Sequence, residues 1–160
     1  MPISIRPIQQ KDNPILAELI RTVFREFNID KPGTVYTDPT TDNLFALFQI
    51  PKSQYWVAEE NGIILGGSGI YPTPELPDGC VELVKLYLSG ESRGKGIGRD
   101  LMQKCIDTAR EFGFTQMYLE SLPELKKAVG MYLKTGFRYL DKPLGNSGHY
   151  ACNIWMVMDL

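Results

Sequence analysis

A glycine-rich turn between an expected strand and an expected helix is the feature of the sequence most specific for chemistry. The stretch from residue 86 to residue 102 reads LYLSGESRGKGIGRDLM, and it places Arg93, Gly96 and Gly98 in the pattern R-x-x-G-x-G. Glycines let successive backbone N–H groups turn toward one point without a Cβ in the way. The amino end of the following helix adds a partial positive charge. The turn therefore predicts a cradle for pyrophosphate that needs no metal ion.

The arginine of this turn would strengthen such a cradle. Arg93 can add charge-assisted hydrogen bonds of about 1.5–3 kcal/mol each. The simpler interpretation is a plain glycine-rich turn before a basic helix. Because the strand, the arginine, both glycines and the helix occur together, phosphate binding is the better explanation.

Two better-known phosphate-binding motifs do not fit the same residues. A P-loop needs Ser or Thr after Gly94 and Lys95, where Gly96 stands, and its first glycine would fall on Ser89. The dinucleotide fingerprint G-x-G-x-x-G fails because its third glycine would be Arg99 or Leu101. The turn is thus neither a P-loop nor a dinucleotide fingerprint.

A serine-hydrolase elbow around Ser68 is also excluded. The segment GGSGI places Ile70 where the second glycine of G-x-S-x-G should stand. The single histidine, His149, lies far from Ser68 in the sequence, and we interpret it as structural.

The hydrophobic pattern predicts the elements that position the turn. Expected strands cover 3–8, both arms of a hairpin within 55–71, then 80–88, 115–121, 137–140 and 150–159. Expected helices cover 12–27, 43–50, 97–112 and 123–134. Asn61 and Gly62 supply the hairpin turn. The order βααβββαβαββ indicates one α/β domain over residues 1–160, with a sheet of mixed direction.

Composition narrows the class of protein. The 160 residues carry 17 basic and 19 acidic side chains, and the resulting net charge of −2 argues against a nucleic-acid binder. No stretch reaches the ~20 apolar residues of a membrane helix, and none resembles a signal peptide. We therefore expect a cytoplasmic protein that binds neither nucleic acid nor membrane. Cys80, Cys105 and Cys152 are far apart, which favours free thiols in a reducing compartment over a disulfide or a zinc site.

Two stretches resemble the GNAT superfamily of N-acetyltransferases. VELVKLYLSGESRGKGIGRDLM is similar to the acetyl-CoA motif of that family, and ESLPELKKAVGMYLKTGFRYL is similar to the second part of its core. The resemblance is specific over residues 81–140. It implies a mixed, mostly antiparallel sheet flanked by helices, with acetyl-CoA as cosubstrate and no metal. It also implies an amine acceptor, either a small molecule or a peptide.

The resemblance assigns cofactor-binding roles residue by residue. The strand backbone at Leu86, Tyr87 and Leu88 would lie beside the pantetheine arm and the acetyl group. Loop amides would take the pyrophosphate, namely those of Arg93, Gly94, Lys95, Gly96, Ile97 and Gly98, with Arg99 close by. The family commonly has an asparagine where this chain has Leu125, so Ser121 or a backbone group would supply that contact.

Two catalytic roles follow from the resemblance, and each has a simpler alternative. Tyr132 would protonate the leaving thiolate, although a tyrosine on an amphipathic helix is usually a core aromatic. Glu82 would act as base, directly or through water, although it can equally be a strand glutamate paired with Lys85. Glu120 is a second candidate for the base.

Other questions stay open from the sequence. A non-catalytic module that binds or senses acyl-CoA would need the cradle but neither Tyr132 nor Glu82. A kinase-like protein is disfavoured by the missing hydroxyl after Lys95. In this fold the acceptor usually meets the first helices and the late loop, here about residues 25–55 and 141–149, and nothing there names a substrate. The apolar last strand, IWMVM, would allow pairing across a homodimer.

Overall fold

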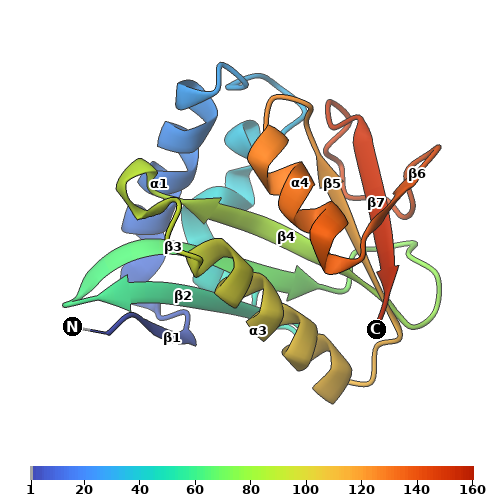
Figure 1. The fold of residues 1–160 in the computed structure, drawn as a ribbon, viewed down its shortest axis with the longest axis horizontal. Coiled ribbons are helices and arrows are strands. Elements are labelled where there is room, and N and C mark those ends of the chain that lie inside the picture. The colour runs from blue at the N-terminus through green and yellow to red at the C-terminus, as the bar shows by residue number, and fades with distance from the viewer. Residues whose placement is uncertain (1) are drawn as a thin grey trace.

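The computed structural model describes residues 2–160 and shows one twisted sheet with helices on both faces (Figure 1). The strands are β1 (Ser4–Pro7), β2 (Gln54–Glu60), β3 (Ile63–Tyr71), β4 (Cys80–Leu88), β5 (Gln116–Ser121), β6 (Arg138–Leu140) and β7 (Ile154–Asp159). The α-helices are α1 (Asn13–Glu26), α2 (Leu44–Leu47), α3 (Ile97–Glu111) and α4 (Lys126–Thr135). Their order along the chain is the one that the hydrophobic pattern predicts.

The sheet has the strand order β1-β2-β3-β4-β5-β7-β6. Only the β4–β5 pair is parallel, and all other neighbours are antiparallel. The expected α/β fold with a mostly antiparallel sheet is therefore confirmed. The last strand was expected to be free to pair across a homodimer. In the structure β7 lies inside the sheet instead, where Val157 pairs with Tyr118 of β5 on one side and with Arg138 of β6 on the other.

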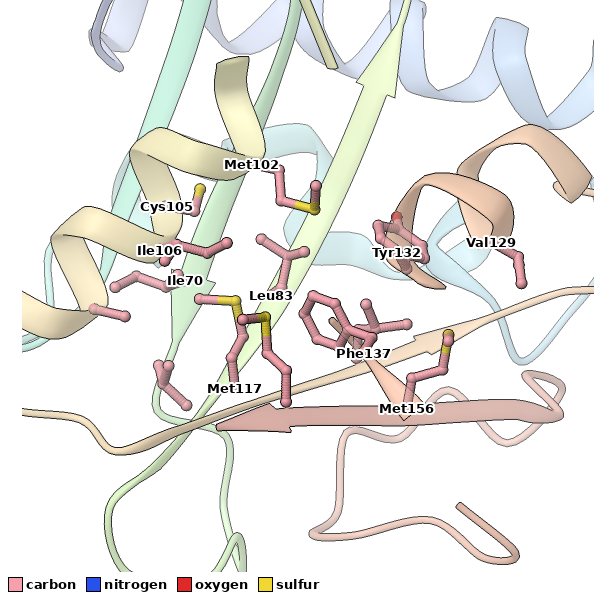
Figure 2. Close-up of a cluster of buried hydrophobic side chains, with 14 residues drawn as sticks. Ile70, Leu83, Met102, Cys105, Ile106, Met117, Val129, Tyr132, Phe137 and Met156 are labelled. Atoms are coloured by element: carbon pink, nitrogen blue, oxygen red, sulfur yellow. The ribbon is translucent and has the colours of Figure 1, made fainter. Parts of the chain in front are cut away.

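Each face of the sheet has its own apolar core. Helices α3 and α4 cover one face through a cluster that includes Met102, Ile106 and Tyr132 (Figure 2). Helices α1 and α2 cover the other face through a second cluster. Because apolar side chains alternate along β4, this strand contributes Val81 and Leu83 to the first cluster and Val84 to the second. Both helix layers therefore rest on β4, the strand that precedes the glycine turn.

Two local predictions have different outcomes. Asn61 and Gly62 both have positive φ angles, 53° and 78°, as the predicted hairpin turn requires. Helix α4 begins at Lys126, three residues after the predicted start. Leu125, the residue before it, has a non-helical ψ of 55°, and its amide closes a turn onto the Leu122 carbonyl at 3.0 Å.

Candidate functional site

A cleft opens where β4 and β5 separate. The two strands pair at only three positions, from Cys80 opposite Gln116 to Glu82 opposite Tyr118, and both continue beyond that point. The space between them is a cleft of about 660 Å³, lined by the later part of β4, the end of β5, the glycine turn, α1 and α4. The strands and turn that the sequence marks for chemistry thus meet around one cavity.

The glycine turn forms the wall of the cleft at the start of α3. Gly94 and Gly96 have φ angles of +79° and +80°, a left-handed conformation that favours glycine. Asp100 is the first residue of α3 whose amide has a backbone acceptor, the Gly96 carbonyl at 3.0 Å. Within residues 2–160, the six amides from residue 94 to residue 99 have no such acceptor. A run of N–H groups at a helix amino end is suited to binding an anion.

The side chain of Arg93 is used differently from the expectation. Its guanidinium forms a bidentate ion pair with Glu26 at the end of α1 and donates to the Leu88 carbonyl at 3.1 Å. It also lies 5.1 Å from the Phe27 ring centre. The side chain therefore ties the turn to α1 instead of standing free for a phosphate, while the Arg93 residue still lines the cleft.

A bulge in β4 shapes the cleft next to the turn. The β3–β4 register passes from Gly69 opposite Val84 to Gly67 opposite Tyr87, which sets two residues of β4, Lys85 and Leu86, opposite the single residue Ser68 of β3. Lys85 has a φ of +54°, a strained value for a side chain of this size. The strand residues that follow the bulge, up to Leu88, line the cleft.

Tyr55 of β2 holds this bulge from across β3. Its hydroxyl donates to the Lys85 carbonyl at 2.9 Å. The Tyr55 ring reaches that far because Gly67 lies beneath it: a Cβ at Gly67 would stand only 2.4 Å from the ring. The GGSG segment of β3, which does not fit a hydrolase elbow, thus has a structural explanation that the sequence did not reveal.

The three residues expected beside the pantetheine arm all line the cleft. They are Leu86, Tyr87 and Leu88, which follow the bulge. Tyr87 packs edge-on against Phe24 of α1, with ring centres 5.3 Å apart. Burial raises the pKa of the Tyr87 hydroxyl far above its ordinary value. These residues form one apolar wall suited to an uncharged chain.

Tyr132 reaches the cleft from α4. Its ring is 7% exposed and packs edge-on against Phe137, with ring centres 5.8 Å apart (Figure 2). Among the described residues the tyrosine hydroxyls that hydrogen-bond to protein groups are those of Tyr36, Tyr55 and Tyr118, and the Tyr132 hydroxyl is not one of them. Burial raises the pKa of this hydroxyl above its ordinary value, so that the proton is retained at neutral pH. The ring belongs to the core, as the simpler interpretation has it, and the residue also lines the cleft.

Glu82 lies on the cleft floor where β4 and β5 part. It is 3% exposed, and the Thr73 hydroxyl donates to its Oε1 at 2.6 Å. Burial, reinforced by the nearby Glu120 carboxylate, raises the pKa of Glu82 to about 8. Glu120 also lines the cleft, and its carboxylate accepts hydrogen bonds from the hydroxyls of Tyr118 and Ser147. Both candidate bases are therefore present at one end of the cavity.

The two residues connected with the departure from the family pattern also line the cleft. Leu125 stands immediately before α4 and packs against the α1-side core. Ser121 is 6% exposed at the end of β5, and its carbonyl accepts from the Asn153 amide at 3.3 Å. Both are close enough to contribute to the same cavity.

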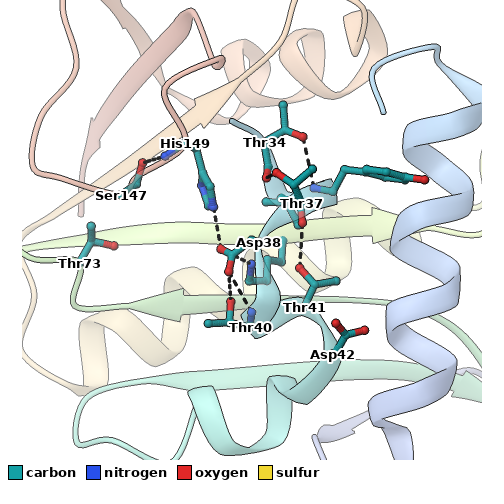
Figure 3. A network of polar contacts seen from close by, with 12 residues as sticks. Thr34, Thr37, Asp38, Thr40, Thr41, Asp42, Thr73, Ser147 and His149 are labelled. Atoms are coloured by element: carbon teal, nitrogen blue, oxygen red, sulfur yellow. Dashed lines mark hydrogen bonds and ion pairs between the residues drawn. The ribbon is translucent and has the colours of Figure 1, made fainter. Parts of the chain in front are cut away.

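A polar network that the sequence did not predict connects Asp38 with His149 and Lys85, which both line the cleft on the side of Glu82 (Figure 3). His149 Nε2 is 2.9 Å from Asp38 Oδ2, and Lys85 Nζ is 3.7 Å from the same oxygen. Thr40 donates to Asp38 Oδ1 through its amide at 2.9 Å and its hydroxyl at 2.7 Å. These contacts hold the pKa of Asp38 well below its usual range, although burial opposes them. No local motif signals a contact between residues this far apart.

The described residues contain neither a helix suited to crossing a membrane nor a cluster of metal ligands. Within residues 2–160, no helix is long and apolar enough to cross a membrane. In the same range, no three His, Cys, Asp or Glu side chains are grouped as metal ligands. The three cysteines are free, with Cys80 and Cys105 buried and Cys152 half-buried at the cleft.

Comparison with known proteins gives consistent matches. Residues 18–137 match the model of the acetyltransferase (GNAT) family. The chain is 37% identical over 158 residues to YjgM of Escherichia coli, described as an uncharacterized N-acetyltransferase, with 98% of this chain and 94% of that protein covered. A GNAT-family acetyltransferase structure from Staphylococcus aureus Mu50 covers 99% of each chain with a TM-score of 0.88 and 24% identity. YncA of Salmonella typhimurium, solved with its cofactor acetyl-CoA, has a TM-score of 0.73 and 22% identity, covering 100% of this chain and 95% of that one.

Proposed function

Because the chain belongs to the acetyltransferase (GNAT) family, we propose that it transfers the acetyl group of acetyl-CoA to a primary amine by direct attack on the thioester. The observation that carries the proposal is the run of partnerless amides from residue 94 to residue 99 at the wall of the cleft. The acetyl-CoA complex of YncA, a protein of the same fold, supports the same ligand here.

The glycine turn would hold the pyrophosphate of acetyl-CoA. The amides of Gly94, Lys95, Gly96, Ile97 and Gly98 are the proposed donors, with Arg99 close by, whereas the expected Arg93 amide already donates to the Gly90 carbonyl at 3.5 Å. No metal is required, because the turn and the α3 amino end supply the positive potential. Lys126 and Lys127 also line the cleft and suit a further phosphate of the nucleotide.

The wall formed by β4 would receive the pantetheine arm. Leu86, Tyr87 and Leu88 present apolar surface there, and Ser121 offers a hydroxyl near the end of β5. The polar contact that the family commonly makes at Leu125 falls to Ser121 or to a backbone group. The reacting thioester would then lie next to the β4 bulge, between Tyr132 and Glu82.

Tyr132 and Glu82 would divide the proton transfers. Tyr132 keeps its proton at neutral pH and has no protein partner among the described residues, so it can donate to the leaving thiolate. Glu82 takes a proton from the attacking amine, directly or through water. Its pKa of about 8 makes it a base that works best at slightly alkaline pH.

Two measurements test the proposal. Calorimetric titration with acetyl-CoA in EDTA should give one site per chain, and loss of binding under chelation would count against a cradle that needs no metal. A panel of amines, followed by release of free thiol from acetyl-CoA, should then show turnover. Binding without turnover on any amine would instead favour the non-catalytic acyl-CoA-binding module.

A further inference from the structure

The far end of the cleft is closed by two segments that are distant in the sequence. One is the segment of 3-10 turns containing Asp38, and the other is the loop between β6 and β7 that contains His149. The second segment is fixed at several points. The Leu144 amide donates to the Tyr118 hydroxyl at 3.1 Å, the Ala151 amide donates to the Gly33 carbonyl at 2.9 Å, and the Ser147 hydroxyl donates to Glu120.

His149 is held in one orientation where these two segments meet. Its Nε2 contacts Asp38 Oδ2 at 2.9 Å, and its backbone amide donates to the Ser147 hydroxyl at 3.1 Å. A carboxylate on Nε2 makes this nitrogen the one that carries hydrogen in the neutral ring. Nδ1 is then the nitrogen with a free lone pair, and no protein group within residues 2–160 hydrogen-bonds to it. His149 also lines the cleft, so its ring is within reach of a bound molecule.

Lys85 contributes, after the hydrogen bond between His149 and Asp38, to keeping Asp38 ionised in this position. Its side chain is 4% exposed, and its Nζ, which solvent does not reach, has no hydrogen-bond partner among the described residues. At 3.7 Å from Asp38 Oδ2 the ammonium is an ion-pair partner without being a hydrogen-bond donor. Leaving a buried cation without hydrogen bonds is costly, so a position of this kind calls for an explanation. Holding Asp38 negative beneath His149 is such an explanation.

We propose that His149 is a catalytic residue, which takes the proton of the acceptor's ammonium group, and that Asp38 and Lys85 are its positioning residues. The proposal rests on the proposed acetyl transfer and adds the base for its first step. An amine acceptor arrives mainly as R–NH₃⁺ at neutral pH and cannot attack until a proton leaves. His149 Nδ1 accepts that proton, and Asp38 stabilises the resulting imidazolium.

The protons then balance. The freed amine attacks the thioester carbon, the C–N bond forms and the C–S bond breaks. The nitrogen loses a second proton to Glu82 as the amide forms, while Tyr132 protonates the thiolate. The proton held on Glu82 then replaces, through solvent, the one that Tyr132 gave. The products are the acetylamide, free coenzyme A and one proton released to solvent from His149, so the acceptor nitrogen gives up two protons in all, one to His149 and one to Glu82.

The charges around His149 suit this role. Asp38 contacts His149 Nε2, Lys85 pairs with the same carboxylate, and Glu82 and Glu120 line the cleft together with His149. Glu82, with a pKa of about 8, is mostly uncharged at neutral pH, but Asp38 and Glu120 still outnumber the single buried lysine, so an incoming ammonium meets a favourable potential. An imidazole is the side chain best suited to take and release a proton near neutral pH.

Two substitutions of His149 separate a base from a structural link. In His149→Gln the amide nitrogen can still donate to Asp38, but the side chain cannot take a proton, whereas His149→Ala removes both functions. We expect both variants to bind acetyl-CoA as the parent does and to lose about 10²-fold in kcat/KM at pH 7. The loss should shrink as the pH approaches the pKa of the acceptor amine, because free amine then needs no base.

Two variants of the 3-10 segment complete the kinetic set. Asp38→Asn should give an intermediate loss, because it weakens orientation and removes the charge opposite the imidazolium. Asp42→Asn is the matched control, since Asp42 lies in the same segment but pairs with Arg21 at the exposed surface. This control should leave kcat/KM unchanged.

The single histidine allows a second readout that does not depend on turnover. In untagged, ¹⁵N-labelled protein the imidazole nitrogens belong to His149 alone. We expect the neutral ring to be the Nε2–H form, and Asp38→Asn to give a mixture of both forms. A parent ring protonated at Nδ1 when neutral would overturn the proposal, because no lone pair would then face the acceptor.

The kinetic outcomes are equally decisive. A His149→Gln variant with the parent rate and pH profile, beside an impaired His149→Ala, would reduce His149 to a structural link. A loss of rate in both variants without any change in pH dependence would also overturn its role as base. If the parent acetylates no amine at all, the proposed function fails and the role of His149 fails with it, whereas the other outcomes leave acetyl transfer intact.

Discussion

The two ends of the cleft differ in how far apart in the sequence their residues lie. The glycine-turn end comes from one short run, residues 93–99, whose shape is set by the left-handed Gly94 and Gly96 and by the start of α3. The far end joins Asp38 to His149, 111 positions later in the chain, above the bulge of β4. Local backbone geometry makes the first end, and long-range packing makes the second.

This difference indicates how the two ends respond to change. The glycine-turn end recognises a group through main-chain amides, so a substitution acts on it mainly through φ angles and added bulk. The far end recognises through side chains that several loops hold in place, so a substitution there acts through lost contacts. The β4 strand joins the two ends, because the same strand supplies the apolar wall at one and Glu82 and Lys85 at the other.

The largest effect on kcat is expected for Tyr132→Phe, at the middle of the cleft between its two ends. The ring and its packing against Phe137 remain, and only the hydroxyl is lost. We expect kcat to fall by about 10²–10⁴-fold with little change in stability, because the thiolate then has no acid. Steady-state kinetics with thermal unfolding checks it, and Tyr139→Phe, at an exposed tyrosine of β6, is the control. A full rate for Tyr132→Phe would leave this residue as packing alone.

A smaller effect on rate and a distinctive pH dependence are expected for Glu82→Gln. The parent rate should rise with pH through about 8, where Glu82 loses its proton, and the variant should lack this rise. Its kcat should fall by about 10²-fold, the lower end for a general base, because water or Glu120 can substitute in part. An unchanged pH profile in the variant would point to another base.

The stability of the same variant provides an independent check on the pKa. The folded pKa of Glu82, about 8, lies above its unfolded value, so the folded state takes up a proton over the interval between them. The free energy of unfolding of the parent should therefore decrease from about pH 4.5 to pH 8 relative to Glu82→Gln. Denaturant titrations at several pH values measure this difference, and a constant difference would contradict the raised pKa.

The smallest effect is expected for the Arg93–Glu26 pair, which connects the glycine turn to α1. Since the pair is half-exposed, Arg93→Met and Glu26→Gln should each weaken acetyl-CoA binding by less than about 5-fold, the range of an exposed ion pair. Equal effects would fit a residue that only positions the turn. A large loss for Arg93→Met beside tighter binding for Glu26→Gln would instead show that the guanidinium leaves Glu26 for a phosphate.

The sequence predicted the first end of the cleft far better than the second. The strand, the R-x-x-G-x-G turn and the helix are contiguous in the sequence. The glycines of the turn themselves indicate where the backbone can take a positive φ angle. The same reading placed Tyr132 and Glu82 on the right elements. It did not predict the contact of His149 with Asp38, because nothing in the loop sequence shows that Asp38 lies 2.9 Å away. The use of Arg93 for Glu26 was missed for the same reason.

The β4 bulge could be predicted from the sequence only in part. The GGSG segment was visible in the sequence, but its purpose depends on Tyr55 crossing β3 to reach the Lys85 carbonyl. Such a contact follows from the strand order β2-β3-β4 and from the register of both strand pairs. The periodicity of the sequence predicts the strands, but it predicts neither their order in the sheet nor the register of the pairs.

Acetyl-CoA binding by the glycine turn is the central claim, and a matched pair of aspartate substitutions tests it most directly. Gly96→Asp and Gly113→Asp both place a carboxylate at a left-handed glycine flanking α3, with φ angles of +80° and +88°. Both therefore introduce similar backbone strain and the same charge, but only Gly96 lines the cleft.

Calorimetric titration of both variants with acetyl-CoA, on protein shown to be folded by circular dichroism, is the measurement. We expect Gly96→Asp to lose at least about 10²-fold in affinity, because two like-charged groups would occupy one desolvated site. Gly113→Asp should bind as the parent does. A folded Gly96→Asp variant with the parent affinity would contradict the assignment of this turn as the pyrophosphate site.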